Sequence, residues 1–104
     1  MTTKARPWPD VAIPPGELLA ETLEALGMSQ AELARRARRP PQAINEIVKG
    51  VKRITPETAL QLERILGVPA HVWLRLQANY ELTKARLAAR RRPAKGSPRR
   101  QAAA

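Results

Sequence analysis

The chain has 104 residues, of which 43% are hydrophobic and 3% aromatic, so it holds one small domain and cannot be a two-domain enzyme. It has no cysteine, which excludes disulfides, thiolate zinc sites and cysteine nucleophiles. Its charge of +10 lies mainly in residues 29–54, with seven basic and two acidic side chains, and in residues 84–104, with eight basic and no acidic ones. These basic segments predict that the partner is nucleic acid, an anionic membrane surface or an acidic protein. Because no apolar run reaches membrane-spanning length, we expect a soluble, cytoplasmic protein.

Prolines set the limits of the predicted helices. The proline-free stretches 16–39, 42–55, 57–68 and 70–92 are long enough for helices, and no alternation of apolar and polar residues indicates a strand. We therefore predict an all-α chain with five helices.

The first two helices are predicted from an apolar stripe and from their end signals. The first spans 15–26 and ends at Gly27, because glycine suits the left-handed turn after a helix. Its inward stripe has helical spacing and comprises Leu18, Leu19, Thr22, Leu23 and Leu26. The second begins at Ser29, which fits a capping box with Glu32, and it ends near Arg38.

Prolines and glycines also delimit the last three helices. The third starts at Pro41, with Pro40 held extended as its N-cap, and Gly50 closes it. The fourth runs from the Thr55-Pro56 start to Leu66. The fifth opens at Pro69 or Ala70 and continues to about Arg92.

The composition divides the chain into three parts. Residues 1–12 are predicted to form an extended N-terminal arm in which Trp8, between two prolines, docks on the body. Residues 13–92 form the domain. Residues 93–104 contain no large apolar side chain, so we expect a flexible, disordered basic tail.

The second and third helices, with the short connection between them, have the dimensions of a DNA-binding helix-turn-helix. Their inward residues are predicted to be Leu33, Ala34, Ala37, Ile44 and Ile47. The opposite face of the third helix then presents Gln42, Asn45, Glu46 and Lys49 as candidates for reading base edges, because glutamine and asparagine can both form paired hydrogen bonds with adenine.

Basic and amide side chains around this unit are candidates for contacts with DNA phosphates. The set comprises Gln30, Arg38, Arg39, Lys52 and Arg53. Gln30 belongs to it because it opens the second helix, where a side-chain amide and the helix dipole can meet a phosphate. The alternative interpretation is a plain solvated helical hairpin.

Residues 13 to about 87 resemble the HigA-type antitoxins, within the lambda-repressor-like (XRE) class of helix-turn-helix proteins. The resemblance rests on IPPGELLAETLEALGMSQAELARR, on QAINEIVKGVKRITPETALQLERILG and on VWLRLQANYEL. It implies a homodimer that binds double-stranded DNA at an operator in its own promoter and masks a cognate ribonuclease toxin of the HigB/RelE-like kind. A free-standing XRE regulator without a toxin stays open as an alternative, and a basic module for RNA or a membrane is a weaker one.

The turn departs from the family pattern. Members usually carry Gly-Val-Ser where this chain has Arg38-Arg39-Pro40. If the geometry is kept, Arg38 in a left-handed conformation costs roughly 1 kcal/mol, and Pro40 lacks the side-chain acceptor of a good N-cap, a loss of about 1 kcal/mol. Either the arginines exchange local stability for phosphate contacts, or the turn simply tolerates the change.

The fifth helix has apolar residues on two sides. One stripe comprises Trp73, Leu76, Tyr80 and Leu87, and the other comprises Leu74, Ala78, Leu82, Ala85 and Ala89. A helix that is apolar on two sides usually buries both, so we predict that Leu74, Ala78 and Leu82 contact a second subunit or a partner. The alternative is that this helix is central in the fold.

No sequence feature supports an enzyme, a cofactor or a metal site. His71 is the only histidine and has no acidic residue three or four positions away. Glu17, Glu21 and Glu24 share one side of the first helix, where a solvated face is the simpler interpretation. The sequence contains no H-E-x-x-H or G-x-S-x-G motif, no P-loop and no dinucleotide-binding fingerprint.

Overall fold

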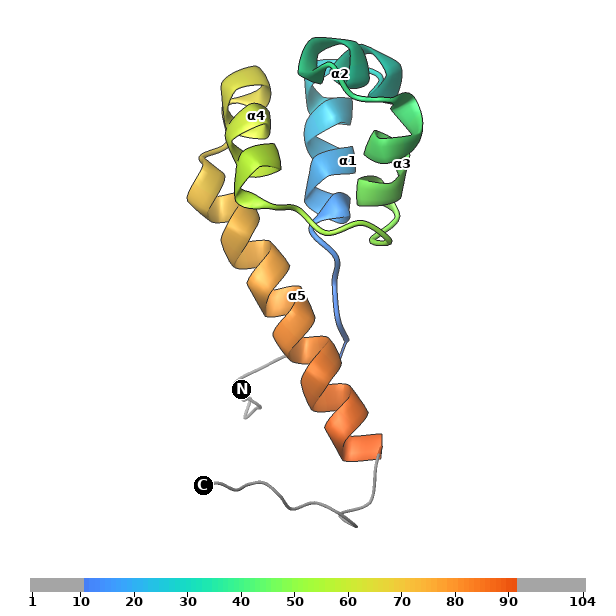
Figure 1. Cartoon of the computed structure of the whole chain (residues 1–104), viewed down its shortest axis with the longest axis vertical. Helices are drawn as coiled ribbons and strands as arrows, with labels where there is room; N and C mark the ends of the chain where they lie inside the picture. The colour runs from blue at the N-terminus through green and yellow to red at the C-terminus, as the bar shows by residue number, and fades with distance from the viewer. Residues whose placement is uncertain (1–10, 92–104) are drawn as a thin grey trace.

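The computed structural model describes residues 11–91 of the chain. Within them, the predicted all-α fold with five helices is confirmed (Figure 1). The helices are α1 (Gly16–Leu26), α2 (Gln30–Ala37), α3 (Pro41–Val48), α4 (Pro56–Leu66) and α5 (Ala70–Arg91). The docking of Trp8 and the disorder of residues 93–104 concern parts of the chain outside the described residues, so both stay predictions.

The helix ends follow from local chemistry. The Ser29 side chain accepts a hydrogen bond from the Glu32 backbone N–H at 3.0 Å, and Thr55 accepts one from the Thr58 N–H at 3.3 Å. Pro40 is extended, with φ −62° and ψ 143°, which directs the chain into α3 without a side-chain cap. Gly27 has φ 67°, the left-handed conformation that a side chain would strain. The predicted starts at Ser29, Pro40 and Thr55 and the predicted end at Gly27 are confirmed, whereas α3 ends at Val48 with Lys49 as its C-cap, one residue before the predicted Gly50.

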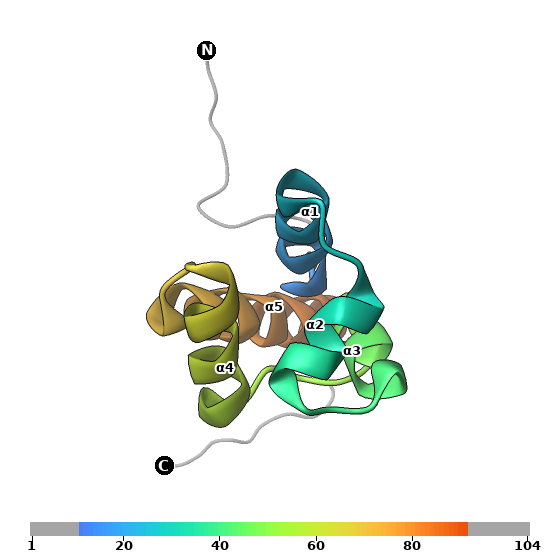
Figure 2. The same ribbon diagram turned by 90° about the horizontal axis from the view of Figure 1, so that it is seen from above.

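Helices α1 to α4 form the body of the molecule, and α5 begins beside α4 and runs away from it, so that its second half projects beyond the body (Figures 1 and 2). Apolar side chains from all five helices and from the connection before α4 meet in one core. The core comprises Leu19, Leu23, Leu33, Ala34, Ile44, Ile47, Ile54, Ala59, Leu62 and Trp73. Trp73 is fully buried, and its ring N–H donates to the Val68 carbonyl at 3.1 Å, so the start of α5 is fixed to the body.

The first turn of α1 lies directly against the last turn of α3. A Cβ added to Gly16 would overlap the carbonyl oxygens of Ile47 and Val48. Only a residue without a side chain permits this backbone approach, and the approach fixes α3 relative to α1.

Two parts of the predicted core are wrong. Leu26 is 52% exposed, because the chain turns at Gly27 and Met28 packs against the core instead. On α5 the buried residues are Trp73, Gln77 and Thr83, while Leu74, assigned to the outer stripe, is half-buried against the core. The buried face of α5 therefore includes polar side chains that an apolar pattern does not mark.

Candidate nucleic-acid interface

The packing of α2 on α3 determines which side of α3 faces outward. The five predicted inward residues of these helices are all buried, and Ala43 is buried with them. Gln42 and Lys49 are exposed on the opposite side, as predicted, whereas Asn45 and Glu46 are half-buried.

Hydrogen bonds hold the half-buried side chains of the outward face of α3. Asn45 donates from its amide to the Gln30 side-chain oxygen at 3.2 Å, so the first residue of α2 lies beside the middle of α3. Gln42 donates to the Glu46 carboxylate at 3.3 Å, one turn along the same helix. The structure thus brings together four of the predicted contact residues, Gln30, Gln42, Asn45 and Glu46, on one surface.

The turn between α2 and α3 keeps the geometry that glycine normally provides. Arg38 has φ 57° and ψ 45° and is the one non-glycine residue with positive φ among residues 11–91. Its N–H donates to the Arg35 carbonyl at 3.2 Å, and the Arg39 N–H donates to Ala34 at 2.9 Å, which closes α2. The predicted condition for strain at Arg38 is therefore met, and its side chain is exposed.

Arg39, predicted to contact phosphate, makes contacts inside the protein. Its Nε donates to the Gln61 side-chain oxygen at 2.6 Å, and its Nη2 donates to the Thr58 hydroxyl at 2.8 Å. Thr58 is 4% exposed, so Arg39 ties the turn to the first turns of α4. Sequence reasoning missed this contact because both partners lie about twenty residues away.

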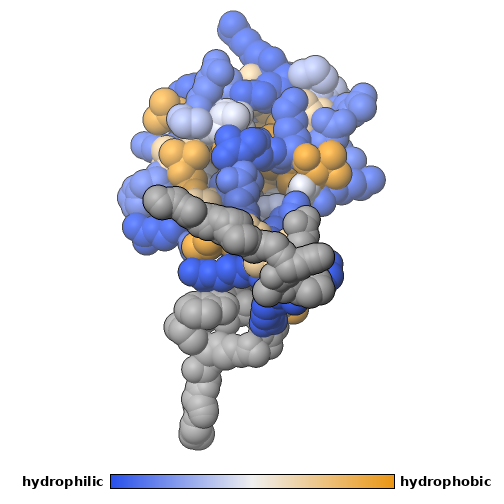
Figure 3. Space-filling view, turned by 60° about the horizontal axis from the view of Figure 1, so that its bottom comes forward, coloured by the Kyte–Doolittle hydropathy of each residue, from blue (hydrophilic) through white to orange (hydrophobic). Residues whose placement is uncertain are grey.

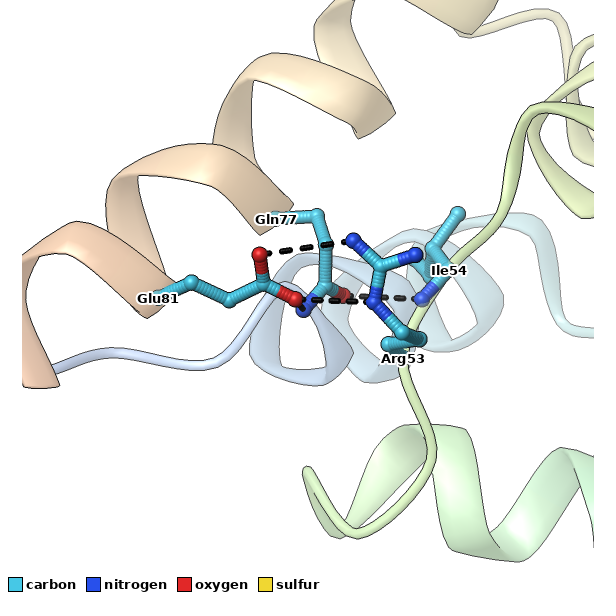
Figure 4. Close-up of polar contacts among 4 residues, drawn as sticks. All are labelled: Arg53, Ile54, Gln77 and Glu81. Atoms are coloured by element: carbon cyan, nitrogen blue, oxygen red, sulfur yellow. Dashed lines mark hydrogen bonds and ion pairs between the residues drawn. The ribbon is translucent and has the colours of Figure 1, made fainter.

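Arg53, also predicted to contact phosphate, forms an ion pair with Glu81 of α5 (Figure 4). Its Nε lies 2.8 Å and its Nη2 3.3 Å from the carboxylate oxygens. Hydrogen bonds from Arg53 and then from Gln77 hold the pKa of the Glu81 carboxyl below its ordinary value. The hydrogen bond to Glu81 raises the pKa of Arg53 in turn.

Known proteins are similar to this chain in sequence and in the arrangement of its helices. A helix-turn-helix family model matches residues 19–73. Virulence-associated protein I of Dichelobacter nodosus is 44% identical over 75 residues, which is 71% of this chain and 69% of that protein. The antitoxin HigA of Pseudomonas aeruginosa, solved with the higBA promoter, superposes with a TM-score of 0.74 at 31% identity over 85% of this chain and 98% of that one. A Coxiella burnetii addiction module antidote protein of the HigA family gives 0.72 at 33% identity, with the same coverage.

The chain belongs to the HigA-type helix-turn-helix family.

This HigA-type chain carries unpaired cations around α3. Among residues 11–91, Arg38, Lys49 and Lys52 take part in no ion pair. Arg36, by contrast, lies 2.7 Å from the Glu32 carboxylate, and Arg35 lies 3.8 Å from it. The turn before α3 and the connection after it therefore offer positive charge that an external anion can contact.

The surface of α5 in this HigA-type chain has two separate apolar areas. Ala78 and Leu82, both predicted to contact a partner, are exposed, and Leu82 is 48% exposed. A groove between residues 11–15 and the other side of α5 is lined by Val11, Ile13 and Tyr80, among others. Sequence reasoning missed this groove, because Val11 and Ile13 precede the first helix. Figure 3 shows apolar side chains as separate patches on a mainly hydrophilic face.

No described helix has the length and apolar character of a membrane span. Within residues 11–91, no group of three or more acidic, histidine or cysteine side chains is arranged so that it could hold a metal ion.

Proposed function

We propose that this protein is a cytoplasmic antitoxin that represses its own operon as a homodimer and neutralises a RelE-like ribonuclease toxin. The observation that carries the DNA-binding part is the outward face of α3, which presents amide side chains between unpaired cations. Two similar Pseudomonas aeruginosa proteins support the same conclusion: the antitoxin HigA solved with the higBA promoter, and PA4674 solved with its operator DNA. The alternative is a free-standing regulator, which the 32% identity with an uncharacterized helix-turn-helix transcriptional regulator of Escherichia coli favours.

In this proposal α3 enters the major groove and reads base edges with Gln42, Asn45, Glu46 and Lys49. Gln42 and Lys49 are exposed and reach the bases directly. Asn45 is half-buried, and its amide donates a hydrogen bond to the Gln30 side-chain oxygen. In this proposal Asn45 keeps that hydrogen bond while it contacts a base. Gln30, Arg38 and Lys52 contact phosphates, whereas Arg39 and Arg53 must first leave their partners within the protein.

A homodimer follows from how such proteins read DNA, since two copies bind half-sites about 34–36 Å apart. The exposed Ala78 and Leu82 of α5 are the proposed contacts with a second subunit or a partner. Leu74 contributes less than its place in the stripe implies, because it packs against the core.

The DNA-binding proposal is tested by titrating operator and scrambled duplexes with single variants. Gln42→Ala or Asn45→Ala should weaken operator binding by about 1–3 kcal/mol and change binding to the scrambled duplex little. Asn79→Ala, which removes an exposed amide from α5, is the matched control and should change neither. Equal weakening on both duplexes would show that α3 is not the reader.

The toxin proposal is tested by co-expression with the product of a neighbouring small, basic reading frame that is lethal alone. The wild type should rescue growth, and so should Gln42→Ala/Asn45→Ala, because neutralisation uses a different surface. A folded wild type that binds its operator yet rescues nothing would favour the free-standing regulator.

The dimer proposal is tested by sedimentation of Leu82→Glu, because Leu82 is exposed and its replacement leaves the core intact. Leu60→Glu introduces the same charge at a 59% exposed leucine on α4 and is the control. The wild type and the control should be dimers at micromolar concentration and Leu82→Glu a monomer. A monomeric wild type would exclude the dimer.

A further inference from the structure

Two residues of α5 hold two successive residues of the connection between α3 and α4 (Figure 4). The Ile54 N–H donates to the Gln77 side-chain oxygen at 2.8 Å, and the Gln77 amide donates to the Glu81 carboxylate at 2.9 Å. Glu81 then accepts from Arg53, so the hydrogen bonds form a closed ring that begins and ends on adjacent residues.

The two sides of this ring differ in burial. Gln77 is 4% exposed and Ile54 is fully buried. The side chains of Arg53 and Glu81 are 57% and 45% exposed. Exposed ion pairs contribute little to stability because water and salt screen them, so Arg53 can exchange Glu81 for another anion. The buried bond to Gln77 keeps the connection in place during that exchange.

The exchange matters because of where Arg53 lies in the chain. It follows Lys52 and stands four residues after Lys49, and both lysines are unpaired cations of the proposed interface. A DNA phosphate offers a guanidinium the same paired hydrogen bonds that the Glu81 carboxylate gives it here. A phosphate that reached this part of the connection would therefore compete with Glu81 for Arg53.

We propose that Glu81 is a positioning residue that holds Arg53 away from DNA phosphates and so limits the sequence-independent part of DNA binding. This inference rests on the proposed DNA-binding function. Gln77 has a separate role, which is to fix the backbone of the connection whether or not Arg53 is paired.

Glu81→Gln tests the proposal, since a glutamine oxygen still accepts hydrogen bonds from Gln77 and Arg53 while the charge is gone. On a scrambled duplex titrated at several salt concentrations, one added phosphate contact should steepen the log–log salt dependence by about 0.9. The same contact should raise affinity about five- to tenfold near 0.1 M salt. Thermal unfolding of each variant confirms that the fold is kept.

Two controls separate a released arginine from a general charge effect. Glu24→Gln removes an exposed carboxylate from α1 and changes the net charge equally, so it should change the salt slope much less. Glu81→Gln/Arg53→Gln should lose the gain. The proposal is wrong if the gain in affinity for the scrambled duplex persists without Arg53, or if Glu24→Gln produces a gain of the same size.

Arg53→Gln alone provides an independent test if Glu81→Gln fails to fold. The proposal expects almost no change in the slope, because Glu81 already occupies Arg53, whereas an arginine that contacts phosphate in the wild type would lower the slope by about 0.9. A wild type that does not prefer its operator overturns the proposed function itself, while a normal preference with no response to Glu81→Gln overturns this inference alone.

Discussion

The α2–α3 pair and α5 bury their side chains in different ways. In α2 and α3 the buried residues are all alanine, leucine or isoleucine, and the polar residues of α3 lie on its outer side. In α5 a glutamine and a threonine are buried while Leu82 is half exposed. The buried side chains of α2 and α3 contribute apolar packing alone, whereas a buried side chain of α5 also satisfies a backbone N–H of a neighbouring connection. The buried face of such a helix is determined by hydrogen bonds as well as by area.

The largest effect is expected when a leucine is shortened to alanine in each of the two regions. Leu33→Ala in α2 removes a fully buried side chain and should lower the free energy of unfolding by about 2–5 kcal/mol. Leu82→Ala in α5 should change it far less in urea unfolding at low protein concentration. A loss at Leu82 that grows with protein concentration would indicate that a second subunit covers this residue. If both variants lost the same free energy of unfolding in dilute protein, the proposed difference in burial between α2 and α5 would be wrong.

The next effect tests whether a polar residue of α5 stabilises the body. Gln77→Leu roughly keeps the volume of the side chain but leaves the buried Ile54 N–H without its acceptor. This should lower the free energy of unfolding by about 1–3 kcal/mol. Asn79→Leu makes the same kind of change at an exposed position of α5 and should be near neutral. Both are measured by urea unfolding, and an unchanged stability in Gln77→Leu would mean that burial of Gln77 has no hydrogen-bonding role.

A smaller effect lies in the turn of the helix-turn-helix. Arg38→Gly should raise stability by roughly 1 kcal/mol, because glycine adopts the left-handed conformation without a Cβ penalty. Arg36→Gly, inside α2, should instead lower stability by a similar amount. Thermal unfolding of the two variants gives the comparison, and a destabilised Arg38→Gly would show that the arginine side chain contributes more than its backbone costs.

The smallest expected effect is the pH dependence of the stability that the Arg53–Glu81 ion pair contributes. The pKa of Glu81 is lowered in the folded protein, so its contribution to stability is present above the unfolded-state pKa and is lost as the pH falls through the folded-state pKa. The difference in unfolding free energy between wild type and Glu81→Gln should therefore be largest near neutral pH and vanish in acid. A difference that is constant with pH would point to a lost contact other than charge.

The local signals of the sequence predicted most of the fold. Ser29, Pro40 and Thr55 determine helix starts through their own chemistry, and the helix period places Gln42 and Lys49 on the outer side of α3. These features depend on residues within one turn of each other.

The polar contacts between distant residues could not be predicted in the same way. Arg39 meets Gln61, and Arg53 meets Glu81, across 22 and 28 residues. An exposed cation and an arginine held by a distant partner look alike in a sequence, because the pairing depends on how the helices cross. This is why the predicted phosphate contacts include two arginines that the structure places against α4 and α5.

The contact at Gly16 has a consequence for how the molecule meets DNA. Because backbone lies against backbone at this point, no side-chain rotamer there can change to absorb a shift of α3 relative to α1. A tilt of α3 in the groove must carry α1 with it, and α1 is anchored in the core through Leu19 and Leu23. If α3 enters the major groove as proposed, the body docks as a rigid unit, and adjustment to the operator falls to the DNA and to the exposed side chains.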